Sequence, residues 1–156
     1  MLFRSDDGEQ LVVRRKDLED SPIPSGGSAA AFGMLRLALL AGEGKYERHA
    51  LGVLRLVYRI AGRHPSAFGH LLQAADFYLA PVREVAIVGP EDQAAELLRV
   101  VRGSYRPHLI LAAGEPDGVP LLRGRTAVDG RAAAYVCEHF VCQAPVTTAD
   151  ELAAAL

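Results

Sequence analysis

Hydrophobic residues recur at helical spacing through the first half of the chain. The stretch 28–41 is apolar on nearly all sides, which predicts a helix that is buried on most of its surface. The stretch 45–62 is amphipathic, and a third helix is expected to begin after His64-Pro65-Ser66 and to end before Pro81. The expected inward stripes are Tyr46, Ala50, Val53, Leu54, Val57, Ile60 and Ala61 in the second helix and Phe68, Leu71, Leu72, Ala75 and Leu79 in the third.

The pattern changes character after residue 81. A short β-branched run at 84–89 closes on a glycine and is typical of a buried strand. An amphipathic helix at 91–103 and a second apolar run at 108–112 follow, so a strand–helix–strand unit with parallel strands is expected. We also expect a third strand at 134–137 and a short final helix at 150–155.

These elements predict a chain of class α/β (α+β). Residues 1–80 are expected to hold an N-terminal hairpin around Asp7-Gly8 and three helices. Residues 81–156 are expected to form a small parallel or mixed β-sheet with flanking helices. The two parts are expected to pack as one compact unit.

Composition narrows the function classes. A chain of 156 residues has room for one ordinary domain, and 50% hydrophobic with 23% charged residues is a globular balance. A formal net charge of −2 argues against a broadly basic nucleic-acid-binding protein. The longest apolar stretch, 29–41, is too short for a membrane span, and the N-terminus lacks the layout of a signal peptide. We therefore expect a cytoplasmic protein with neither nucleic acid nor membrane as a partner.

The two cysteines, Cys137 and Cys142, leave three alternatives open. Four residues separate them, whereas redox dithiols of the thioredoxin kind have two. A fully extended segment would hold their Cα atoms roughly 17 Å apart, but a tight turn at 138–141 would close that gap. The pair is therefore interpreted first as buried structural thiols, second as a bridge or redox pair, and third as a metal site with His139. A fourth ligand is missing, so we expect no metal.

Other candidate sites have simpler explanations. Val88-Gly89-Pro90 follows a strand and begins a helix, as nucleotide sites do, but Glu91 and Asp92 would repel a phosphate. No nucleophile motif is present, so no catalytic residue or cofactor is expected. The histidines are expected at the surface or at helix ends, and the early acidic residues in solvated loops: His49, His64, His70, His108 and His139, and Asp6, Asp7, Asp17, Glu19 and Asp20.

Several strings, in this order, resemble the C-terminal end of a known family. They are Asp6-Asp7-Gly8-Glu9, Leu11-Val12-Val13-Arg14, Pro24-Ser25-Gly26-Gly27-Ser28, Ala74-Ala75-Asp76-Phe77, Glu84–Gly89, Val128–Ala132 and Tyr135–Gln143. The family is that of the large thioredoxin-domain-containing proteins of the YyaL type, also called the spermatogenesis-associated protein 20 family. The string Tyr135–Gln143 is the most specific part of the resemblance, which covers essentially the whole chain.

The resemblance implies that much of the family architecture lies outside this chain. Family members begin with a thioredoxin-like domain and continue into an (α/α) toroid similar to sugar epimerases. This chain would hold the last helical hairpins of the toroid and a small α/β cap. The loop Pro24, Ser25, Gly26, Gly27 and Ser28 would face the toroid's cleft, and Gly27 stands where family members usually have Asn.

Three hypotheses follow for function. The first is a non-catalytic module that associates with itself, as a homo-oligomer, or with a partner chain carrying the missing domains. The second is a remnant sugar-binding domain that uses the loop 24–28. The third is a thiol-redox role for Cys137 and Cys142.

Overall fold

The computed structural model describes residues 18–20, 22–138 and 141–156. The hairpin expected around Asp7-Gly8 lies outside these residues. Internal contacts divide the chain into two units. Of the described residues, the first unit holds those up to Leu35 together with Gly44–Tyr78, and the second holds Arg36–Glu43 together with those from Leu79 onward.

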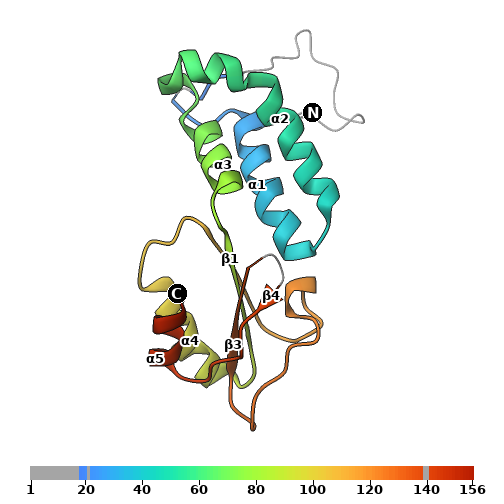
Figure 1. The fold of residues 1–156 in the computed structure, drawn as a ribbon, viewed down its shortest axis with the longest axis vertical. Helices are drawn as coiled ribbons and strands as arrows, with labels where there is room; N and C mark the ends of the chain where they lie inside the picture. The colour runs from blue at the N-terminus through green and yellow to red at the C-terminus, as the bar shows by residue number, and fades with distance from the viewer. Residues whose placement is uncertain (1–17, 21, 139–140) are drawn as a thin grey trace. The chain divides into compact units, whose positions relative to one another are not determined.

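Three helices dominate the first part of the chain (Figure 1). Helix α1 covers Gly26–Ala41, α2 covers Gly44–Arg63 and α3 covers Gly69–Leu79. A single 3₁₀ turn, η1 (Pro65–Ala67), precedes α3. The prediction of three helices is confirmed, and each lies within a few residues of its expected bounds.

The core of the first unit uses part of the predicted stripes. Val57, Ala61, Phe68 and Leu71 form one buried cluster. Three stripe predictions were wrong, because Ile60, Leu72 and Leu79 are 46%, 39% and 79% exposed. Periodicity gives the spacing of an apolar stripe, but a helix with two apolar stripes does not reveal which one faces its neighbours.

The second unit is built on a four-stranded mixed sheet of order β2-β1-β3-β4. Strand β1 (Arg83–Val88) pairs in parallel with β2 (Leu109–Ala113), and helix α4 (Glu91–Arg102) makes the crossover. Strand β3 (Ala133–Glu138) pairs antiparallel with β1 and with β4 (Val141–Cys142). The class and the parallel pair are confirmed, whereas β4 was not predicted.

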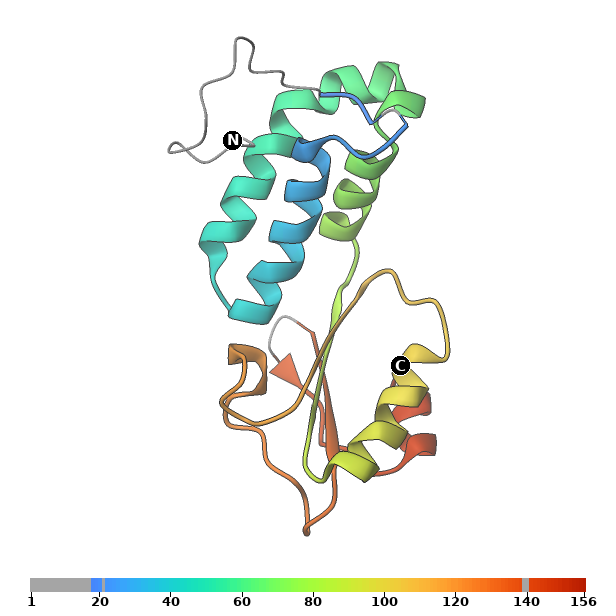
Figure 2. The ribbon, with the colours of Figure 1, turned by 180° about the vertical axis from the view of Figure 1, so that it is seen from behind.

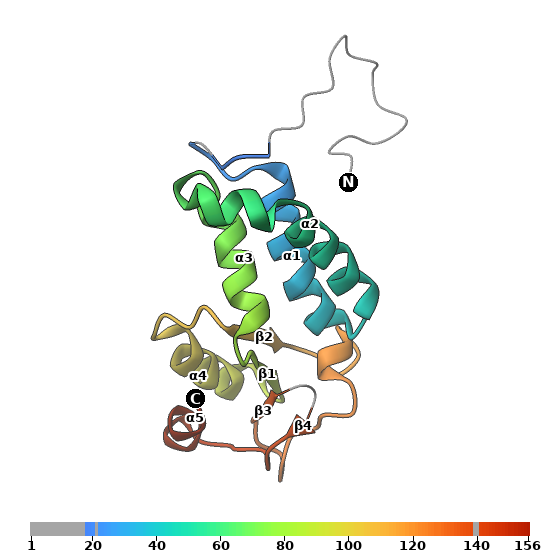
Figure 3. The same cartoon turned by 45° about the horizontal axis from the view of Figure 1, so that its top comes forward.

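The two faces of this sheet differ in chemistry. Helices α4 and α5 (Ala149–Ala155) cover one face, as Figures 2 and 3 show. The core on that face is Val85, Ile87, Leu97, Val101, Leu109, Ala132, Ala134, Val136 and Leu152. Since side chains alternate along a strand, Glu84, Tyr135 and Cys137 lie on the opposite face. The 3₁₀ turn η2 (Pro120–Leu122) contacts β1 and β2, and its Leu121 and Leu122 are buried.

Candidate functional site

Strands β3 and β4 bring the two cysteines together. Cys137 and Cys142 are register partners, their Cα atoms are 3.9 Å apart, and their sulfurs form a disulfide. The backbone N–H of Gln143 donates to the carbonyl of Val136 next to them, at 3.0 Å. The pairing of β4 with β3 therefore brings the cysteines within bonding distance, and the default interpretation as two buried thiols was wrong.

The two halves of the disulfide differ in exposure. Cys137 is 2% exposed on a strand that is paired on both sides. Cys142 is exposed on the edge strand β4, beside Val141, which is 76% exposed. A reagent in solution therefore meets Cys142 first.

Arg125 lies directly against this disulfide. Its Nη2 is 3.3 Å from the Sγ of Cys137 and 3.2 Å from the Sγ of Cys142. Its Nη1 donates to the carbonyl of Leu121 and, at 3.4 Å, to that of Arg123. The buried Nε has no hydrogen-bond partner among the described residues. The Arg125 guanidinium thus lies where a negatively charged thiolate would form if the disulfide were reduced.

Tyr135 helps to hold the segment that carries Arg125. Its hydroxyl donates to the carbonyl of Thr126 at 2.9 Å and accepts from the N–H of Thr126 at 3.3 Å. The Arg125 guanidinium lies 5.9 Å from the centre of the Tyr135 ring, within the range of a cation–π contact. Sequence reasoning missed Arg125 because it lies 12 residues before the nearer cysteine.

The metal alternative for the cysteines receives no support from the geometry. Both sulfurs are bonded to each other, whereas metals bind the thiolate. In the described part of the chain no group of three His, Cys, Asp or Glu side chains could hold a metal ion. His139, the third ligand considered, lies outside the described residues.

The loop Pro24–Ser28 begins helix α1 and is organised by Asp20. The Ser25 hydroxyl caps the helix by accepting from the N–H of Ser28 at 3.1 Å, and the two hydroxyls lie 2.9 Å apart. Asp20 accepts from the N–H of Ser25 at 2.7 Å, and from those of His70 and Leu71 at 2.9 and 3.1 Å. Partial burial opposes ionisation of Asp20, but these bonds and one from the Ser28 side chain outweigh it and lower its pKa.

The loop's polar groups are thus engaged within the protein. Ser25 and Ser28 are 5% and 1% exposed, while Pro24 and Gly26 are exposed and Gly27 is half-buried. A sugar-binding role for this loop stays a prediction. Of the acidic residues expected in solvated loops, Asp20 instead joins the starts of α1 and α3. Asp6, Asp7 and Asp17 lie outside the described residues.

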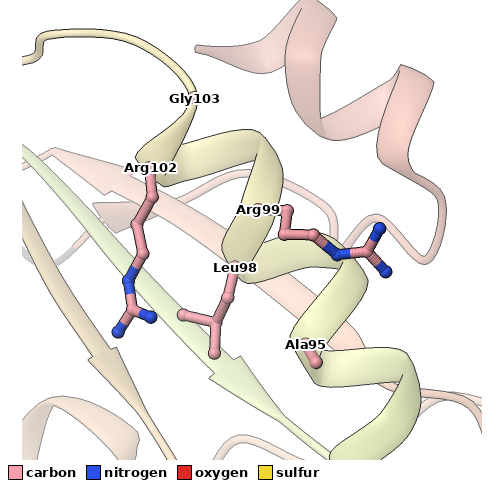
Figure 4. Close-up of a pocket in the computed structure, with 5 residues that line it drawn as sticks. All are labelled: Ala95, Leu98, Arg99, Arg102 and Gly103. Carbon is pink, nitrogen blue, oxygen red and sulfur yellow. The ribbon is translucent and has the colours of Figure 1, made fainter.

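A groove on α4 is lined by Ala95, Leu98, Arg99, Arg102 and Gly103 (Figure 4). Arg99 and Arg102 leave the helix on different sides of Leu98, so their guanidinium groups do not converge on one point. The groove therefore lacks the focused charge of an anion site. No described helix is both long enough and apolar enough to span a bilayer.

Comparison with known proteins gives three similar curated sequences. The chain is 30% identical to spermatogenesis-associated protein 20 of Rattus norvegicus and of Homo sapiens, and 29% identical to that of Mus musculus. Each alignment covers 93% of this chain and 20% of the relative. The chain therefore spans about a fifth of the length of these relatives. No family model matches the sequence, and no solved structure matches it significantly.

Proposed function

Because the chain belongs to the spermatogenesis-associated protein 20-like family and spans about a fifth of its relatives' length, we propose that it acts as a non-catalytic packing module. Its exposed apolar helix faces would bind the part of the family architecture that this chain does not span. That part would be supplied by the same polypeptide or by a separate one.

The observation that carries the proposal is a second apolar stripe on α2. Ala50, Val57 and Ala61 are buried on one face of this helix. Leu56 and Ile60 lie one turn apart on another face, and they are 72% and 46% exposed. A helix that buries one stripe and exposes a second one is suited to lie between two neighbours.

Helix α3 repeats the arrangement. Leu71, Ala74 and Phe77 are buried, whereas Leu72 and Leu79, seven residues apart, are 39% and 79% exposed. Fully burying a leucine side chain contributes roughly 1.5–3 kcal/mol. Apolar side chains gathered on one surface mark an interaction site more often than isolated ones do.

The length of the relatives favours one partner for the exposed apolar faces of α2 and α3, namely the part of the family architecture that this chain does not span. Four-fifths of each relative lies outside the aligned region. A chain that evolved against so much additional protein is expected to keep apolar faces for it. A second copy of this chain is the competing partner for these faces, and crosslinking distinguishes the two partners.

Site-specific photo-crosslinking tests the proposal in the protein's native cells. The photoreactive residue p-benzoylphenylalanine replaces Leu56, and in a matched control it replaces Glu47, an exposed polar residue of the same helix. We expect crosslinks from position 56 to peptides that align with the uncovered part of the relatives. Crosslinks to a second copy of this chain, or none above the control, would overturn the proposal.

A further inference from the structure

The disulfide offers chemistry that a packing module does not need. The two cysteines are the only ones in the chain, and they are bonded to each other across two strands. A bond that served only to join these strands would gain nothing from a cation. Arg125 nevertheless directs one nitrogen at both sulfurs.

The effect of Arg125 depends on the oxidation state of the pair. A disulfide is neutral and its sulfurs are weak acceptors, so the guanidinium gains little from it. After reduction, a thiolate at the same place would accept a charge-assisted hydrogen bond, which is roughly twice as strong as a neutral one. Arg125 therefore stabilises the reduced pair more than the oxidised pair, as cations do beside reactive cysteines.

One buried group acts in the opposite direction. Glu84 on β1 is the register partner of Cys137, shares its sheet face and is 1% exposed. Burial favours the neutral carboxylic acid, and its ionised form would disfavour a negative charge on the sulfur. Tyr135 and the Leu121 carbonyl keep the guanidinium beside the sulfurs, so the cation stays close enough to offset that opposition.

We propose that Cys137, Cys142 and Arg125 form a thiol–disulfide exchange site that reacts with external dithiols. A thiolate of the dithiol attacks the exposed Sγ of Cys142 and forms a mixed disulfide. The Cys137–Cys142 bond breaks, and Cys137 leaves with the electron pair as a thiolate beside Arg125. The second thiolate of the dithiol then attacks the dithiol's first sulfur, which is bonded to Cys142 in the mixed disulfide. This step closes the dithiol's own disulfide and releases Cys142 as a thiolate.

Atoms and electrons balance over the two steps. The external dithiol loses two electrons and two protons and becomes a disulfide. The cysteine pair gains the two electrons, and its two thiols take up two protons from solvent. The reverse sequence oxidises the pair and reduces an external disulfide. The exposure of Cys142 and the burial of Cys137 set the order of attack.

Equilibration in glutathione buffers tests the proposal. The full chain is incubated at several ratios of reduced to oxidised glutathione, in which two glutathione molecules take the place of the two thiols of the dithiol. The samples are then quenched with acid and alkylated, and their masses are measured by mass spectrometry. We expect the native protein to pass reversibly between the bridged and dithiol forms within the accessible ratios. A bond that stays oxidised at every ratio, or opens only on denaturation, would be structural and would overturn the proposal.

Charge variants test the role of Arg125. Arg125→Gln is expected to lower the equilibrium constant for reduction about tenfold, which corresponds to one unit of thiol acidity. Arg125→Lys keeps the positive charge and should change this equilibrium constant less. Arg123→Gln removes an exposed neighbouring cation and should leave the equilibrium constant for reduction unchanged. Equal constants for Arg125→Gln and the wild type would refute the proposed role of the cation.

Single-cysteine variants test the order of attack without depending on Arg125. Cys137→Ser leaves the exposed Cys142, which should form a mixed disulfide with oxidised glutathione. Cys142→Ser leaves the buried Cys137, which should react at least about tenfold more slowly because reactivity requires access. Circular dichroism checks that both variants are folded. Equal rates, or a faster Cys137, would overturn the assignment of Cys142 as the attacked sulfur.

Discussion

Gly89 lies against the backbone of Ala132, so closely that a Cβ built on it would be 2.6 Å from the Ala132 Cα. Gly89 follows β1 with a φ of +118°, a backbone conformation that residues other than glycine rarely adopt. Ala132 is 1% exposed and belongs to the core beneath α4. The glycine after this strand therefore serves close packing, which explains its position without a nucleotide.

Replacing Gly89 with alanine is expected to destabilise the protein. The added methyl would meet backbone atoms that cannot move aside, in a strained conformation, and such strain costs about 1–3 kcal/mol. Chemical denaturation should show a lower midpoint for Gly89→Ala. Gly52→Ala is the matched control, because Gly52 lies inside α2 with nothing within 4 Å of its Cβ position. It should raise stability by about 0.5–1 kcal/mol. A neutral Gly89→Ala would show that the loop repacks freely.

The order of the elements could be predicted from the sequence, because amphipathic stretches and continuous apolar runs alternate with glycines and prolines that end them. Strand β4 could not, because two residues show no alternation and become a strand only by pairing with β3. The exposure of Ile60 and Leu79 could not be predicted from the sequence either. Both fit the helical period, and only the three-dimensional arrangement decides which apolar stripe is covered.

The candidate site was visible only in part. The spacing of Cys137 and Cys142 allowed a bridge but did not require one, since the outcome depends on a turn between them. Arg125 lies in a stretch expected to be irregular, and no local pattern connects it to the cysteines. Its contact with both sulfurs arises because β3, β4 and the segment after η2 meet on one sheet face.

Asp20 should contribute to stability in a pH-dependent way. Its two carboxylate oxygens accept from the N–H groups of Ser25, His70 and Leu71. Asp20→Asn replaces one of these acceptors by an amide donor and should lower the free energy of unfolding by about 1–2 kcal/mol near pH 7. The pKa of Asp20 is lowered in the folded protein from an ordinary value of 3.8. Its contribution is therefore complete above that value and is lost as the pH falls through the lowered folded pKa.

Chemical denaturation at several pH values tests the direction of this pH dependence. The difference between the wild type and Asp20→Asn should be constant at neutral pH and should shrink below about pH 4. Glu19→Gln changes the exposed neighbouring carboxylate and should leave the curve nearly unchanged. A difference that grows on acidification would contradict the assignment.

Leu152 should anchor α5 to the sheet. It is 0% exposed and lies in the core of the second unit. Thr148 and Glu151 form a capping box that starts this seven-residue helix. Leu152→Ala should cost about 2–5 kcal/mol through lost burial and a cavity. Leu79→Ala removes the same atoms from a side chain that is 79% exposed and should change stability by less than about 0.5 kcal/mol. Thermal unfolding compares the two variants directly, and similar losses of stability would contradict the difference in burial between Leu152 and Leu79.

Gln93 should secure the same backbone that Gly89 approaches. Its Oε1 accepts from the N–H of Ala132 at 3.0 Å, and it reaches this position from the first turn of α4. Gln93→Ala would leave a donor in the buried Ala132 without its partner, at a cost of about 1–3 kcal/mol. Gln93→Glu keeps an acceptor oxygen and places a negative charge near the helix N-terminus, where it is favoured. We therefore expect Gln93→Glu to unfold at nearly the wild-type denaturant concentration while Gln93→Ala unfolds earlier. Hydrogen exchange of the Ala132 amide should accelerate only in Gln93→Ala, and equal protection in both variants would show that this bond does not hold the loop.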